Sequence, residues 1–163
     1  MFNRRLELCD GIVASFDDEK NVYICNVAWL GRDIEIWLSA SDYDDNEIKS
    51  LKITFEKFWN ERLSLLVASQ NDIRERVIPY IAKKSASNEY SLFSEVSADD
   101  FDADYWLTSV YIVSDLDGDY GEVQMNFYKD GNEDNYENFL VSRELISGHL
   151  TFYVDSFPIS DEI

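Results

Sequence analysis

A chain of 163 residues, of which 45% are hydrophobic and 15% aromatic, is expected to fold as one domain, residues 1–163, around a packed core. Its 33 acidic and 14 basic residues give a net charge of −19, which disfavours binding to nucleic acid or anionic membrane and favours basic proteins or cations. No run approaches the roughly 18 apolar residues of a membrane helix. Glu7 and Asp10 interrupt the N-terminal segment, so we expect no signal peptide and a cytoplasmic location.

The first forty residues predict strands separated by turn signals. Asp10-Gly11 and Gly31-Arg32 are typical of chain reversals. The expected strands are 6–8, 12–14, 22–29 and 34–39. Cys9 and Cys25 lie in this region and are too few for a disulfide framework. We expect two reduced thiols buried as small apolar groups, although neighbouring strands could also bring them face to face.

The clearest helix signal begins at Asp44, a favourable N-cap residue, with Glu47 three positions later in the capping-box position. Apolar residues then recur at helical spacing, at Ile48, Leu51, Phe55, Phe58, Trp59, Leu63 and Leu66. This stripe predicts a long helix packed on a sheet, with Phe55, Phe58, Trp59 and Leu63 largely inaccessible. A second, shorter helix is expected from about Asp72 to Lys84, kinked by Pro79.

The remaining residues predict a short acidic turn of helix at 98–104 and further strands. Turn signals at 115–119 and at Asp130-Gly131-Asn132 separate apolar alternating segments. The expected strands are 106–113, 123–127, 139–141 and 150–154. Strands, then helices, then strands favour an α+β fold with a largely antiparallel sheet packed against one long helix and a second shorter helix.

Few motifs point to catalysis or to a bound metal. His149 is the only histidine, and no nucleophile elbow, phosphate-binding loop or dinucleotide fingerprint is present. Asp115, Asp117 and Asp119 have the 1-3-5 spacing of a calcium loop, but Tyr120 and Asn126 occupy the positions where such a loop needs Gly and Glu. We expect a hairpin turn there, with weak calcium binding as an open alternative, and neither an enzyme nor a cofactor.

Acidic residues are concentrated in the C-terminal part of the chain. Residues 94–163 carry 17 acidic and 2 basic residues, whereas residues 1–93 carry 16 and 12. Carboxylates beside tyrosines suit recognition of a Lys/Arg-rich protein surface, because charge speeds the encounter and Tyr supplies contact area. The predicted partner-binding residues are Asp99, Asp100, Asp102, Asp104, Tyr105, Asp115, Asp117, Asp119, Tyr120, Asp130, Glu133, Asp134, Tyr136 and Glu137.

Two resemblances accompany these features. The stretch 93–154, with its acidic helical turn, Trp106-led strand, Asp-Gly hairpin and Ser147-Gly148-His149-Leu150 segment, resembles a family of uncharacterised small bacterial α+β domains. In size, acidity and α+β make-up the whole chain is similar to bacterial immunity proteins of contact-dependent growth inhibition and polymorphic toxin systems. That resemblance implies binding to a cognate toxin, often a nuclease. The class shares no common motif, so it assigns no residue a role.

Three functions are therefore compared. The first is an immunity (antitoxin) protein whose acidic loops neutralise a basic toxin domain, without binding nucleic acid or membrane directly. The second is a nucleic-acid mimic that inhibits a DNA-handling enzyme; it ranks lower, because the acidic clusters are irregularly spaced and do not copy a phosphate ladder. The third is a housekeeping or weakly calcium-binding domain. The sequence favours the first.

Overall fold

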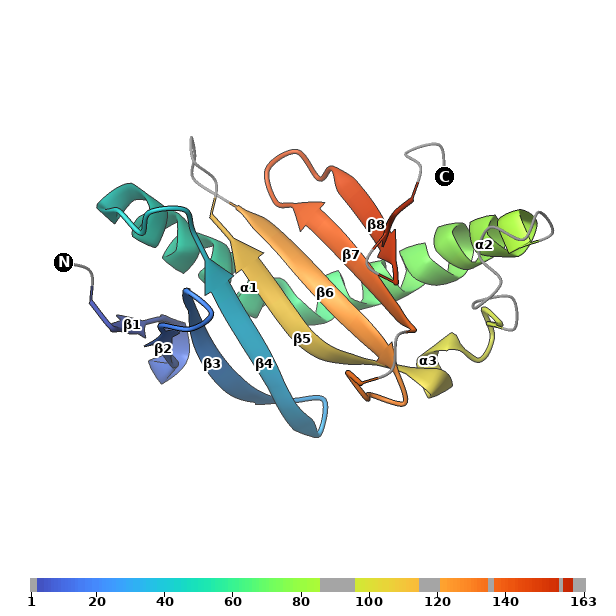
Figure 1. The fold of residues 1–163 in the computed structure, drawn as a ribbon, viewed down its shortest axis with the longest axis horizontal. Coiled ribbons are helices and arrows are strands. Elements are labelled where there is room, and N and C mark those ends of the chain that lie inside the picture. The colour runs from blue at the N-terminus through green and yellow to red at the C-terminus, as the bar shows by residue number, and fades with distance from the viewer. Residues whose placement is uncertain (1–2, 86–95, 115–120, 135–136, 156, 160–163) are drawn as a thin grey trace. The chain divides into compact units, whose positions relative to one another are not determined.

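The protein has an α+β fold with a largely antiparallel sheet, as the sequence predicted (Figure 1). In the computed structural model, the described residues are 3–85, 96–114, 121–134, 137–155 and 157–159. Within these ranges nine strands form one sheet in the order of the chain. The strands are β1 (Arg5–Glu7), β2 (Val13–Asp17), β3 (Val22–Trp29), β4 (Arg32–Ser39), β5 (Tyr105–Val113), β6 (Glu122–Lys129), β7 (Asn138–Glu144), β8 (Leu150–Val154) and β9 (Phe157–Pro158).

The helical elements lie between β4 and β5. They are α1 (Asp45–Asp72), a π-helical turn η2 (Ile73–Val77), α2 (Ile78–Ser85) and the short α3 (Phe101–Asp104); a 3-10 turn, η1 (Cys9–Gly11), separates β1 from β2. Because this long connection returns the chain to the sheet in the same direction, β5 pairs with β4 in parallel, with Ile36 opposite Val110. No helix in the described part of the chain is long and apolar enough to cross a membrane.

The chain divides into two compact units. The first unit comprises residues 1–62, 109–124 and 142–150, and the second unit comprises residues 63–108, 125–141 and 151–163. The core of the first unit lies between β3, β4 and the N-terminal part of α1. Its largest buried apolar side chains on β4 and α1 are Ile34, Ile36, Leu38, Leu51, Phe55 and Phe58, and the rings of Trp29 and Phe58 meet edge to face at 6.1 Å.

The core of the second unit lies between the C-terminal helical segments and strands β5 to β8. Its largest fully buried side chains are Ile73, Ile81, Phe101, Phe127 and Phe139. The Ser69 hydroxyl is 3.5 Å from the Met125 sulfur, and the Arg76 guanidinium lies 5.1 Å from the Phe152 ring centre. Each unit thus packs helix against sheet with its own apolar side chains.

The predicted N-terminus of the long helix is confirmed. The Asp44 carboxylate accepts a hydrogen bond from the Glu47 N–H at 2.8 Å. The Glu47 side chain, however, is buried and accepts hydrogen bonds from the N–H groups of Ser41 (2.8 Å) and Asp42 (3.0 Å). It therefore fixes the segment that leads from β4 into α1.

The predicted buried stripe of α1 is partly wrong. Phe55 and Phe58 are fully buried, but Trp59 is half-buried and Leu63 is 64% exposed. Small polar residues take part in the buried face: Ser50, Thr54 and Ser69 are each at most 2% exposed. Thr54 shows why, because its hydroxyl accepts a hydrogen bond from the Gly121 N–H at 2.7 Å. The predicted stripe contained only apolar residues, so it included the exposed Leu63 and left out the buried Ser50, Thr54 and Ser69.

The sequence predicted that Pro79 kinks the second helix, and the structure places Pro79 at the second position of α2. The π-helical turn precedes it, and the Ile78 N–H bonds to the Ile73 carbonyl, five residues back. A proline lacks an N–H and its ring collides with the carbonyl four residues back in a regular α-helix. We attribute the tolerance of Pro79 to the wider turn, which is a usual place for such local adjustment.

Both cysteines are free thiols. Cys25 is buried, and burial raises its pKa to about 12. Cys9 is half-exposed in η1. Its pKa is raised mainly by partial burial and, to a smaller extent, by the nearby Asp10 carboxylate. Neither environment favours the reactive thiolate.

Candidate functional site

The structure describes two of the three predicted acidic segments, both in the second unit. Asp115, Asp117, Asp119 and Tyr120, and also Tyr136, lie outside the described residues. Among the others, Glu137 is half-buried, and the exposed carboxylates are Asp99, Asp100, Asp102, Asp104, Asp130, Glu133 and Asp134. The first segment ends in α3, and the third begins in the turn between β6 and β7.

A backbone hydrogen bond joins these two segments. The Asp130 N–H donates to the Asp104 carbonyl at 2.6 Å. On one side, the Asp104 N–H bonds to the Asp100 carbonyl at 3.0 Å and closes the α3 turn. On the other, Asp130 and Gly131 both have positive φ (55° and 66°) and form a tight turn directly after β6, closed by the Asn132 N–H on the Lys129 carbonyl at 3.1 Å. Two stretches far apart in sequence therefore present one acidic surface, which we call the α3 surface.

Ion pairs neutralise only part of the α3 surface. The Arg74 guanidinium pairs with Asp102, and the Lys129 ammonium lies 3.4 Å from Glu137. The remaining exposed carboxylates of the two segments form no ion pair with another described residue. Carboxylates held close together with little compensation favour the approach of a cationic partner.

Tyr105 is not the exposed contact residue that the sequence suggested. Its side chain is 3% exposed, its ring stacks on Phe101 at 5.4 Å and it meets Phe139 edge to face at 5.0 Å. Its hydroxyl donates to Glu137 at 3.2 Å. Burial, and then the neighbouring Glu137 carboxylate, raise the pKa of Tyr105, so the phenol stays neutral. Tyr105 supports the surface from below.

Within the described part of the α3 surface, Trp106 is an exposed aromatic residue; it stands at the start of a strand predicted from the sequence but is not among the predicted contact residues. Its side chain is 40% exposed. Its indole N–H donates to the Ala103 carbonyl at 3.0 Å, which holds the ring against α3. Because side chains alternate along a strand, burial of Tyr105 directs Trp106 outward. Alternation was the available signal, but it does not say which of the two neighbours is buried.

Two further features concern metal binding and the single histidine. No group of three or more His, Cys, Asp or Glu side chains there is arranged to hold a metal ion. His149 is exposed in the turn that precedes β8, and its backbone N–H bonds to the Ser147 hydroxyl at 3.1 Å. Comparisons with protein-family models, curated proteins and solved structures found no match.

Proposed function

We propose that this chain is a bacterial immunity (antitoxin) protein that acts in the cytoplasm by binding a cognate basic toxin domain of the nuclease type. It neutralises the toxin by occupying its substrate groove, and it is a binding protein without catalytic activity, cofactor or metal. The proposal is supported most by the α3 surface, where the Asp130–Asp104 backbone bond joins two exposed acidic segments beside an exposed Trp106.

This combination suits a groove that binds nucleic acid. Such a groove is lined by Lys and Arg, which carboxylates attract from a distance and pair with on contact. Tryptophan is enriched among residues that dominate binding energy, and Arg stacks well on its ring face. We assign Trp106 as the central contact and Asp99, Asp104 and Asp134 as carboxylates that engage the rim of the groove.

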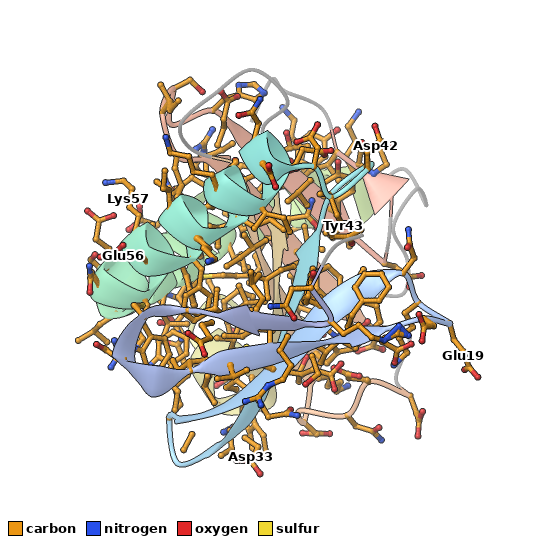
Figure 2. All side chains as sticks on the ribbon, turned by 90° about the vertical axis from the view of Figure 1, so that its left-hand side faces the viewer. Glu19, Asp33, Asp42, Tyr43, Glu56 and Lys57 are labelled. Carbon is orange, nitrogen blue, oxygen red and sulfur yellow. The ribbon has the colours of Figure 1, made fainter. Side chains whose placement is uncertain are left out.

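The test is charge reversal with a matched control. One variant replaces Asp99, Asp104 and Asp134 with Lys. The control replaces Glu19, Asp33 and Glu56, three exposed carboxylates of the first unit (Figure 2), with Lys, so both variants change the net charge equally. Each is co-expressed with the toxin domain encoded beside this gene, after a pull-down with wild-type protein and mass spectrometry has identified the partner.

We expect the α3-surface variant to lose protection and the control to keep it. Association should slow at least tenfold for the α3-surface variant at 0.1 M salt, and the difference should shrink at 1 M, because the Debye length falls from about 10 Å to about 3 Å. Full protection by the α3-surface variant, with association independent of salt, would contradict the proposal. Capture of a DNA-handling enzyme in place of a toxin would favour the mimic function.

A further inference from the structure

Strand β1 in the first unit has one unpaired edge. Within the described ranges it is hydrogen-bonded to β2 only. The Phe16 N–H bonds to the Arg4 carbonyl and the Leu8 N–H to the Ile12 carbonyl, each at 2.8 Å. Backbone groups in an antiparallel pair point alternately toward and away from the partner. Those of Arg4, Leu6 and Leu8 therefore face β2, and those of Arg5 and Glu7 point to the outer edge.

The outer edge offers one N–H and two carbonyl groups. The Arg5 N–H is already bonded to the Asn3 side-chain oxygen at 3.1 Å. The Glu7 N–H and the carbonyls of Arg5 and Glu7 are bonded to no described residue. These groups are arranged as in a sheet that can accept one more strand.

A hollow of about 870 Å³ lies against this edge. It is lined by three consecutive residues of β1, Arg5, Leu6 and Glu7. Tyr23 of β3 and Ile48 and Lys52 of α1 also line it, so the hollow lies between the sheet and the start of α1, beside β1. Asp42 and Tyr43, in the segment that leads into α1 and labelled in Figure 2, also line the hollow.

The floor of the hollow is aromatic and held in place. Tyr23 and Tyr43 are buried, and their rings meet edge to face at 5.5 Å. The Tyr43 hydroxyl donates to the Asn21 carbonyl at 2.5 Å, and the Tyr23 hydroxyl donates to the Asn3 carbonyl. Tyr43 also has a positive φ of 54°, which is rare for a bulky residue. The floor is thus preformed.

The rim of the hollow is acidic. Four carboxylates line it, from Glu7, Asp42, Asp44 and Asp45, against two cations, from Arg5 and Lys52. The two tyrosine rings, 1% and 6% exposed, close the bottom of the hollow, so the groups that a Lys or Arg side chain meets there are the carboxylates of the rim.

We propose that the free edge of β1 and this hollow together bind an extended basic peptide segment of a partner protein. The segment adds as a strand beside β1, its main chain bonding to the Glu7 N–H and to the Arg5 and Glu7 carbonyls. One Lys or Arg side chain enters the hollow. This site goes beyond the proposed function, since it uses the first unit and none of the α3 surface. A second copy of the chain is a poor occupant, because each copy carries a net charge of −19.

The experiment separates main-chain pairing from charge. The ligand is the labelled peptide Val-Lys-Val-Lys-Val-Lys, measured by fluorescence anisotropy at 0.3 M salt. Glu7→Pro removes the outward N–H without breaking a bond to β2, and Glu7→Ala is its matched control, because it removes the same carboxylate and keeps the N–H. We expect Glu7→Pro to weaken binding at least about tenfold and Glu7→Ala about two- to threefold.

Further variants and peptides complete the test. Asn3→Ala frees the Arg5 N–H and should tighten binding. A peptide with Glu in place of Lys, or with N-methylated backbone, should bind at least about tenfold more weakly than the parent peptide. The Asp99, Asp104 and Asp134→Lys variant should bind the peptide within about threefold of wild type, which separates this site from the α3 surface.

Three results would overturn the proposal. They are equal weakening by Glu7→Pro and Glu7→Ala, equal binding of the Glu-containing peptide, and no binding of the parent peptide. Circular dichroism of each variant establishes that the comparison is made between folded proteins.

Discussion

The two units present their acidic residues in different ways. In the first unit, carboxylates ring a hollow whose floor consists of buried tyrosines, beside the free edge of β1. In the second unit, carboxylates project from α3 and from the segment after β6, Trp106 is exposed next to α3, and Tyr105 is buried. The first arrangement suits a single side chain and an extended strand, and the second suits a broad basic surface.

The comparison shows that acidity alone does not define a binding region. Acidic residues are about equally dense in the two units, and what distinguishes the surface of the second unit is the backbone bond between Asp130 and Asp104 and the outward direction of Trp106. The hollow of the first unit draws its carboxylates from β1 and from the start of α1. In both proposed sites, we expect the groups behind the carboxylates to select the kind of partner.

The largest expected effect concerns the two parts of α1. Phe58→Ala in the first unit should lower the free energy of unfolding by about 3–5 kcal/mol, because Phe58 is fully buried. Leu63→Ala in the second unit should change it by less than about 0.5 kcal/mol, since Leu63 is 64% exposed. Urea unfolding measures both. A loss below about 1 kcal/mol for Phe58→Ala would mean that the buried face of α1 lies elsewhere.

An intermediate effect concerns alkaline pH. The pKa of Cys25 is raised by burial from 9.0 to about 12. Below pH 9 the thiol is neutral in both folded and unfolded chains, so it makes stability neither rise nor fall with pH. Between pH 9 and 12 only the unfolded chain ionises there, which lowers the free energy of unfolding by about 1.4 kcal/mol per pH unit.

Urea unfolding at pH 8 and at pH 10.5 tests this difference. Cys25→Ala should lose about 2 kcal/mol less than wild type between the two pH values. Tyr105→Phe in the second unit should also reduce the loss, but only above pH 10, because the folded-state pKa of Tyr105 is raised above its ordinary value of 10.0. An unchanged slope in Cys25→Ala would place that thiol in contact with water.

The smallest expected effects on stability are those of substitutions at Tyr105 and Trp106, which are neighbours on β5. Tyr105→Phe removes the hydroxyl that donates to Glu137 and should cost about 1 kcal/mol, while leaving association with a basic toxin domain unchanged. Trp106→Ala should cost less than about 1 kcal/mol in stability and weaken that association at least tenfold. Urea unfolding and surface plasmon resonance supply the two readings. If both substitutions weakened binding equally, Trp106 would not be distinguished as the contact residue from the buried Tyr105.

Local signals in the sequence determined the fold class. Asp44 and Glu47 predicted the start of α1 because an N-cap needs only neighbours within one turn. Gly11, Gly31 and Gly131 predicted turns because glycine adopts a positive φ without a steric penalty. Each of them has a positive φ in the structure. The acidic segments of the α3 surface could also be predicted, since the charge of a segment follows directly from its residues.

Tertiary structure decided which face of each element is covered and which distant segments meet. Periodicity shows that Tyr105 and Trp106 point in opposite directions, but only packing against Phe101 and Phe139 buries the first of them. The parallel pairing of β4 with β5 and the bond between Asp130 and Asp104 join residues far apart in the chain. Such contacts depend on how the whole chain closes its core, and no local preference encodes that choice.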